Sequence, residues 1–121
     1  MKWDPETTPN FSLEEMACKC GCGGCEVKQE HMDRMQRIRD RFGPLPVNSG
    51  WRCKNHPEEK KKSKPGSHNQ GTATDIKIEN ASDRFRFIKI AIDEGITGLG
   101  IYKTFIHIDS GHEHMPRPAI W

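Results

Sequence analysis

Four cysteines and three glycines occupy the eight residues from Cys18 to Cys25, and this segment constrains the fold of the chain most strongly. Such a density of glycine predicts a tight loop. Cysteines this close together are poorly placed to pair with one another in a relaxed disulfide. Together with Cys53 they leave three interpretations open: a structural metal site made of three loop cysteines and Cys53, one disulfide from the loop to Cys53, or free thiols.

The composition explains why such a cross-link would be useful. Only 33% of the 121 residues are hydrophobic and 30% are charged. A chain of this size buries roughly two-thirds of its unfolded surface, so its hydrophobic core must be lean and a bound metal or a disulfide would add stability. The length fits one domain. We divide it into an N-terminal arm with the cysteine-rich loop, residues 1–26, and a core, residues 27–121.

Charge and hydropathy exclude several classes of partner. The chain has 19 basic and 17 acidic residues, whereas a dedicated nucleic-acid binder usually carries a dense basic excess. Lys60–Lys64 is most simply a solvated loop, offset by Glu58 and Glu59. No apolar run approaches the roughly 20 residues of a membrane helix, and Met1–Glu6 lacks the apolar core of a signal peptide. We therefore expect a monomer without nucleic-acid or membrane partners, and leave its localisation open.

The hydrophobic pattern predicts two long helices and one short helix. Apolar residues recur every three or four positions over 28–42, at Met32, Met35, Ile38 and Phe42. A second helix is predicted over 83–94, capped by Ser82, with a buried face formed by Phe85, Ile88, Ala91 and Ile92. Ser12 and Glu15 form a capping box that opens a short helix.

Short β-branched and alternating segments predict the strands. They lie at 46–51, 72–78, 99–102 and 105–109, and the tail that follows them is predicted as a loop. Along the chain the predicted order is helix, helix, strand, strand, helix, strand, strand. This order indicates an α+β fold with a small, mainly antiparallel sheet flanked by helices.

The segment Phe105–Asp109 places chemistry on one face of a strand. Side chains alternate along a strand, so Ile106 and Ile108 face the core while His107 and Asp109 share the opposite face. His68 is expected on the loop that enters the strand 72–78, and Asp75 within that strand.

A catalytic zinc site would explain the placement of these polar residues. A catalytic zinc takes three nitrogen or oxygen ligands and leaves its fourth position to water, and the ligands we predict are His68, Asp75 and His107. Asp109 is then free as a general base, or as a group that orients a ligand. The sequence His112-Glu113-His114 is either a solvated loop or a rim from which Glu113 carries protons.

Several motifs resemble those of the zinc D-Ala-D-Ala peptidase family, which shares its fold with the Hedgehog signalling domain. His68-x-x-Gly71-x-Ala73-x-Asp75 resembles the first zinc motif of that family, and Phe105–Gly111 looks like the second motif of one branch. Three further segments agree with the family. Ser49-Gly50-Trp51-Arg52 resembles a Ser-Gly-Tyr-Arg segment, Gly98–Tyr102 resembles a glycine-rich strand, and Arg117–Trp121 is similar to a common terminus. The resemblance runs from about residue 46 to residue 121.

The resemblance implies a single zinc peptidase domain that acts on peptidoglycan stem peptides. In this family one zinc is held by His, Asp and His, which correspond to the ligands predicted above. The family arginine corresponds to Arg52, whose guanidinium suits a substrate carboxylate or a carbonyl that gains charge. Ser49 and Tyr102, from the neighbouring motifs, are assigned to substrate binding. The resemblance leaves open whether the activity is that of a D-Ala-D-Ala carboxypeptidase or of an endopeptidase. It also fits both a phage lysis enzyme (endolysin) and a bacterial wall-trimming enzyme.

The sequence also departs from the family pattern. Gly66 stands where a serine usually precedes the first histidine, with Ser67 one place later, and Thr104 stands where many relatives have an acidic base. Asp109 is our substitute base; in an alternative register His112 would be the ligand and Asp109 its base. Two other functions therefore stay open: a catalytically silent metal- and peptide-binding module, and a cysteine-rich zinc-binding interaction module.

Overall fold

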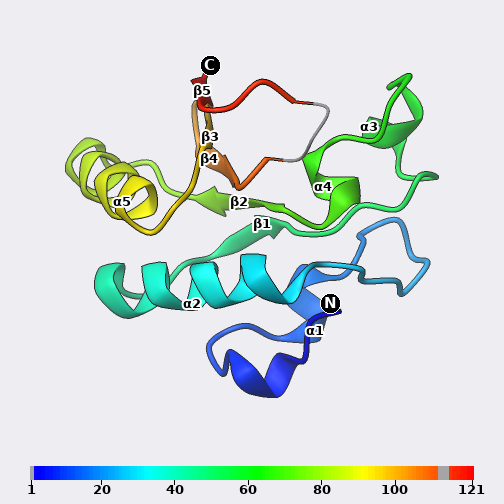
Figure 1. Cartoon of the computed structure of the whole chain (residues 1–121), viewed down its shortest axis with the longest axis horizontal. Coiled ribbons are helices and arrows are strands. Elements are labelled where there is room, and N and C mark those ends of the chain that lie inside the picture. Colours follow the sequence, from blue (N-terminus) through cyan, green and yellow to red (C-terminus); the bar gives the residue numbers. More distant parts are fainter. Residues whose placement is uncertain (1, 112–114) are drawn as a thin grey trace.

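The computed structural model describes residues 2–111 and 115–121. Figure 1 shows the elements in their spatial arrangement. In chain order they are a 3₁₀ turn η1 (Pro5–Thr7), α1 (Leu13–Met16), α2 (Gln29–Phe42), β1 (Val47–Ser49), α3 (Pro57–Lys60), α4 (Ser67–Gln70), β2 (Ala73–Lys77), α5 (Ala81–Asp93), β3 (Gly98–Ile101), β4 (Phe105–Asp109) and β5 (Ala119–Ile120). The α+β class is confirmed, and so is the capping box of Ser12 and Glu15 that opens α1.

The five strands form one mixed sheet in the order β1-β2-β4-β3-β5. The first three pairings are antiparallel, but β3 and β5 run parallel. The prediction of a mainly antiparallel sheet with a loop as its tail is therefore corrected, because the tail returns beside β3 in the same direction. Backbone bonds hold it there, from Ala119 N to the Thr97 carbonyl (2.9 Å) and from Trp121 N to the Leu99 carbonyl (2.9 Å).

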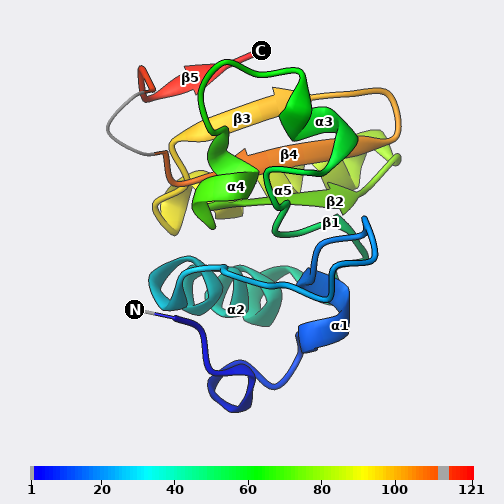
Figure 2. The same cartoon turned by 90° about the vertical axis from the view of Figure 1, so that its right-hand side faces the viewer.

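The sheet separates the hydrophobic core from the polar face. Figure 2 shows α4 on one side of the sheet and α5 behind it. Ile76, Ile106 and Ile108 point to the side of the core and are buried there. The odd-numbered side chains of β2 and β4, among them Asp75 and His107, project from the opposite face because successive side chains alternate along a strand.

The two long helices pack against the core face of the sheet, and α5 buries a face that differs from the predicted one. Met32, Met35 and Ile38 of α2 are buried as predicted. In α5, Ala91 is buried as predicted and Ile88 is partly buried against the core. Phe87 and Ile90 are also buried, whereas the predicted Phe85 is 74% exposed and Ile92 is exposed. This helix carries two overlapping apolar stripes, and the sheet covers the one centred on Phe87. Its N-cap is Asn80 rather than Ser82.

The N-terminal arm packs into the same hydrophobic core as the rest of the chain. Trp3, Phe11, Met16 and Cys25 are buried in one cluster with residues of α2 and of the sheet. The Trp3 indole N–H donates to the Thr8 hydroxyl at 2.8 Å, so its polar atom is satisfied despite burial. Among the described residues no helix is both long and apolar enough to cross a membrane.

A buried histidine beneath the sheet should make the stability depend on pH. His31 of α2 lies 2.8 Å from the Thr74 hydroxyl, and burial together with the nearby Arg34 lowers its pKa to about 3. The unfolded chain takes up a proton near pH 6.5, whereas the folded chain keeps His31 neutral. The free energy of unfolding should therefore decrease as the pH falls from about 6.5 to 3, by up to ~1.4 kcal/mol per pH unit from this group.

Urea unfolding at a series of pH values, with a chelator present, measures this dependence. The variant His31→Gln keeps a hydrogen-bonding side chain but does not titrate, so its stability should fall less steeply with acid than that of the wild type. Equal slopes for the two proteins would show that His31 does not remain neutral in the fold.

Candidate metal centre

Three elements bring the predicted ligands together. Asp75 of β2 and His107 of β4 are direct partners in the antiparallel ladder, so their side chains leave the sheet side by side. His68 comes from α4, a single helical turn where the sequence predicted a loop. Gly71 ends that turn with a φ of 80°, where a Cβ atom would lie 2.4 Å from the Glu26 carbonyl oxygen. Glycine at this position therefore allows the turn that carries His68 to end in the left-handed region, packed against the backbone of Glu26–Lys28.

The three ligand atoms form a nearly regular triangle. His68 Nε2 lies 3.1 Å from Asp75 Oδ1 and 3.2 Å from His107 Nδ1, and the latter two atoms are 3.0 Å apart. Ligand atoms about 2.0–2.1 Å from a tetrahedral zinc lie roughly 3.3 Å from one another. All three side chains are buried. The donor set and its spacing therefore fit one zinc ion.

The outer hydrogen bonds show which ring nitrogens are free to bind a cation. His68 Nδ1 is 2.7 Å from the Gly50 carbonyl oxygen, which can only accept, so this nitrogen carries the proton. His107 Nε2 is 2.7 Å from Asp109 Oδ2 and donates to it in the same way. The nitrogens that face Asp75 are therefore unprotonated in the neutral rings. Three lone pairs point at one place, an arrangement that is repulsive until a cation lies between them.

The pKa values of these groups show where the site favours a positive charge. Burial lowers the pKa of His68. Burial also opposes a charge on His107, but its hydrogen bonds with Asp109 and Asp75 raise its pKa overall. For Asp75, hydrogen bonds with His107 and His68 outweigh the effect of burial and hold the pKa well below its usual range. A proton on His107 thus occupies the position that a metal ion would take, and metal binding should release it.

Asp109 accepts hydrogen bonds at both of its carboxylate oxygens. It is fully buried and accepts two hydrogen bonds from Arg117, both 2.8 Å long, one from the Gly111 amide at 2.9 Å and one from His107. Although burial opposes its charge, Arg117 above all holds the pKa of Asp109 well below its usual range. Arg117 has a role that sequence reasoning missed. Gly98 leaves room for this pair, since a Cβ atom there would collide with both Asp109 and Arg117, but the sequence carries no signal of that contact.

An open cleft of about 570 Å³ adjoins the three ligands. Arg52 lies in its wall, with Nη2 3.2 Å from Asp75 Oδ2 and Nη1 3.7 Å from the buried Glu59. Ser49 does not line the cleft but accepts a hydrogen bond from Arg52 Nε at 3.1 Å. Glu58, an exposed carboxylate in the wall, was not singled out from the sequence, because Glu58 and Glu59 were interpreted only as offsetting the lysine-rich loop.

Aromatic side chains also line the cleft. Tyr102 stacks on Phe105 with ring centroids 4.6 Å apart, and its hydroxyl oxygen accepts a hydrogen bond from Trp121 Nε1 at 3.1 Å. The Trp121 ring also lies 5.3 Å from the His107 ring. The tail that forms β5 thus closes one side of the site, a contribution that its sequence pattern did not indicate.

The other residues singled out from the sequence differ in what the structure shows of them. Glu113 and the alternative ligand His112 lie outside the described residues. Thr104 is exposed in the turn before β4 and does not line the cleft. Ser67, one place after the usual serine position, is buried with its hydroxyl 3.5 Å from His107 Nε2.

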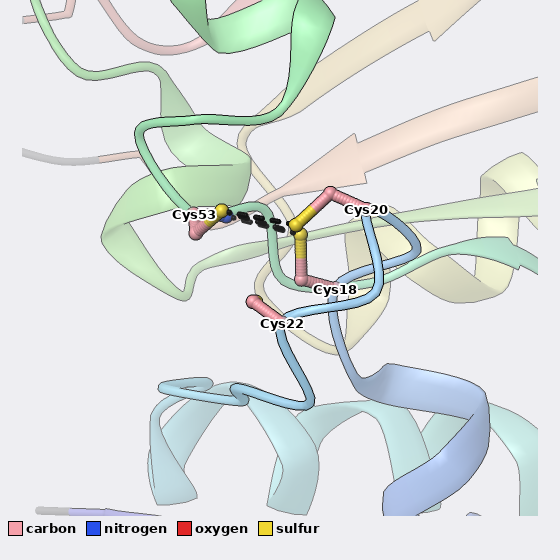
Figure 3. A group of neighbouring side chains, drawn as sticks. All are labelled: Cys18, Cys20, Cys22 and Cys53. Atoms are coloured by element: carbon pink, nitrogen blue, oxygen red, sulfur yellow. Dashed lines mark hydrogen bonds between the residues drawn. The ribbon is translucent and has the colours of Figure 1, made fainter.

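The cysteines form a second cluster. Figure 3 shows Cys18, Cys20 and Cys22 on one loop, beside Cys53 on another. Their sulfur atoms all lie within 4.8 Å of one another. Cys25, the fourth cysteine of the loop, is not part of this group, since its thiol lies 3.5 Å from the Met16 carbonyl oxygen in the core.

Comparison with known proteins identifies the family of this chain. A family model described as Peptidase M15 matches residues 9–109, a range that contains all three ligands and the cysteine-rich loop. Searches of curated proteins and of solved structures gave no match. Because the match covers most of the chain, the protein belongs to the peptidase M15 family, that of the zinc D-Ala-D-Ala peptidases.

Proposed function

We propose that this protein is a zinc peptidase that hydrolyses amide bonds in peptidoglycan stem peptides. Its family consists of zinc-dependent peptidases that act on peptidoglycan peptides. The observation that carries the proposal is the convergence of three lone pairs, from His68, Asp75 and His107, beside an open cleft. A zinc ion in that position would polarise the scissile carbonyl and lower the pKa of a water molecule.

The residues around the ligands support binding of an anionic or polarised substrate. Arg52 presents a guanidinium group to the cleft, and its contact with Asp75 Oδ2 fixes the orientation of that group. In this position it suits the terminal carboxylate of a stem peptide or a carbonyl oxygen that gains negative charge. Tyr102 and Trp121 would pack against the apolar parts of the peptide.

Asp109 is best suited to orienting His107. All its described contacts are to hydrogen-bond donors, and it does not line the cleft, so it has no direct route to a substrate. A carboxylate that orients a metal-binding histidine fixes its tautomer and raises its basicity. We propose that protons are carried instead by a carboxylate at the rim of the cleft. Glu58 is the described candidate and Glu113 the alternative.

The arm and the core would act as one peptidase domain. Residues of 1–26 and of 27–121 share one hydrophobic cluster, which supports a single functional unit. The pairing of the two zinc motifs on adjacent antiparallel strands supports a fold like that of the Hedgehog domain and its peptidase relatives.

Replacing Arg52 by lysine should raise KM without removing the metal. Lysine keeps the charge but lacks the planar fork that can contact Asp75 and substrate together. A lost charged hydrogen bond is worth about 1.5–3 kcal/mol, so kcat/KM should decrease by roughly 10- to 100-fold. Steady-state kinetics and zinc analysis test this, with Arg86→Lys on the exposed face of α5 as the control. Unchanged kinetics would remove Arg52 from the substrate site.

Digestion of purified muropeptides, followed by mass spectrometry, tests the proposed function itself. The zinc-loaded protein should shorten stem peptides, and a chelator should stop the reaction. Release of D-Ala would identify a carboxypeptidase, whereas cleavage within the peptide or its cross-link would identify an endopeptidase. If the protein binds zinc tightly but yields no product, it is instead the silent binding module that Thr104 in place of an acidic residue allows.

A further inference from the structure

Four sulfur atoms gather between two separate loops, and none of the four cysteines lines the cleft. Cys53 Sγ lies 3.7 Å from Cys18 Sγ and 3.3 Å from Cys20 Sγ, and Cys22 completes the group within 4.8 Å. Sulfur ligands about 2.3 Å from a tetrahedral zinc lie roughly 3.8 Å apart. The cluster therefore has nearly the dimensions of a tetrathiolate zinc site, and Figure 3 shows its side chains gathered from both loops.

Backbone amides already point at two of these sulfurs. The Cys53 amide donates to Cys18 Sγ at 3.3 Å, and the Gly24 amide donates to Cys22 Sγ at 3.3 Å. Such outer hydrogen bonds stabilise negative charge on a sulfur ligand and fix its direction. A disulfide would satisfy at most two of the four sulfurs, and all five cysteines are free thiols in this structure.

We propose that Cys18, Cys20, Cys22 and Cys53 bind a structural zinc ion as thiolates. Four sulfurs fill the tetrahedral shell, so no position is left for water or substrate, as is typical of structural rather than catalytic zinc. The ion adds a second link between the arm and the loop that follows β1, besides the hydrophobic cluster that they already share.

The loop that carries three of the ligands is shaped by its glycines. Gly21 and Gly23 have φ values of 96° and 73°, in the left-handed region that side chains other than glycine rarely adopt. Gly24 packs so closely on the Trp51 ring that a Cβ atom would lie 2.9 Å from it. The turns that bring three cysteines to one point thus depend on these residues.

The same ion would support the catalytic centre through the segment Gly50–Cys53. Gly50 accepts the hydrogen bond of His68 Nδ1, Arg52 contacts Asp75, and the next residue, Cys53, is the zinc ligand. The Trp51 amide also donates to the Met16 carbonyl, which ties the segment to α1 just before the cysteine-rich loop. Loss of the thiolate zinc should therefore loosen the orientation of His68. This second step rests on the proposed function, whereas the thiolate site does not.

Metal analysis of purified variants tests the thiolate site. Wild-type protein prepared with zinc should hold two ions per chain, Cys53→Ser one, and His107→Ala one. Cys25→Ser is the matched control, since Cys25 lies in the same loop but outside the cluster, and it should keep both ions. A wild type with one zinc that survives in Cys53→Ser but not in His107→Ala would overturn the proposal, as would iron in place of zinc.

Cobalt substitution provides a readout that does not depend on a folded cysteine variant. His107→Ala loaded with Co²⁺ should show the thiolate-to-cobalt charge-transfer absorption in the near ultraviolet, because all four sulfurs are intact. After removal of the metal and denaturation without reductant, an alkylating reagent should modify all five cysteines. No charge-transfer absorption, or only three alkylated cysteines, would contradict the site and indicate oxygen ligands or a disulfide.

The link to the catalytic centre has its own test. In Cys53→Ser the remaining zinc should bind about 10-fold more weakly than the same site in Cys25→Ser, as measured by competition with a chelator. Equal affinities would overturn the link. Two zinc ions in a protein that cuts no muropeptide would refute the proposed function while leaving the thiolate site intact, so the two failures can be told apart.

Discussion

Replacing His107 by alanine should remove the ion from the candidate centre and lower peptidase activity by on the order of 10³-fold or more. The substitution deletes one of the three lone pairs that define the site and disconnects Asp109 from it. Stabilisation of transition-state charge by a metal is worth several kcal/mol, and each 1.36 kcal/mol is a factor of ten in rate. Hydrolysis of a stem peptide and the zinc content of the variant measure the two effects.

Thr104→Ala is a suitable control for this experiment. Thr104 is exposed, precedes the same strand and does not line the cleft, so its replacement should leave both the zinc content and the activity unchanged. Circular dichroism should show that both variants are folded. If His107→Ala kept its full zinc content and activity, the histidine pair would not be the metal centre.

Replacing Asp109 by asparagine should weaken zinc binding roughly 10- to 100-fold, because His107 loses the carboxylate that fixes its tautomer. The substitution also leaves the mostly buried guanidinium of Arg117 without its partner, which should destabilise the fold by up to about 3–5 kcal/mol. Competition with a chelator measures the first effect, and urea unfolding of the metal-free protein measures the second.

The double variant Asp109→Asn/Arg117→Gln separates these two effects. Without the unpaired charge, much of the stability should return, whereas zinc affinity should stay low because His107 still lacks its carboxylate. A general base would behave differently, since its removal would reduce kcat and leave zinc affinity intact. That result would return Asp109 to the catalytic role that the sequence first suggested.

The sequence predicted local order better than long-range contacts. Alternation along Phe105–Asp109 placed His107 and Asp109 on one face, because this pattern depends only on the geometry of a strand. The adjacency of Asp75 and His107 depends on which strands pair, and periodicity carries no such information. The ligand set was predicted instead from the donor chemistry that zinc prefers and from the resemblance to a family.

The wrong predictions of the fold share a physical cause. Which side chains are buried and which strands pair depends on parts of the chain that lie far apart in the sequence. The apolar stripe through Phe85 and Ile92 in α5 is a plausible buried face, but the sheet covers the neighbouring stripe through Phe87. A two-residue strand such as β5 has no detectable period, so neither the parallel pairing nor the contact of Arg117 with Asp109 could be read from it. Which three of the four loop cysteines gather at Cys53 was likewise open from the sequence, and the structure decides it by packing Cys25 into the core cluster.

A crystal structure of the zinc-loaded protein, with anomalous scattering recorded at the zinc absorption edge, tests the central claim most directly. The account predicts an anomalous peak about 2.0–2.2 Å from His68 Nε2, Asp75 Oδ1 and His107 Nδ1, with a coordination position open to the cleft. The absence of a peak among these three atoms in a crystal grown with saturating zinc would contradict it.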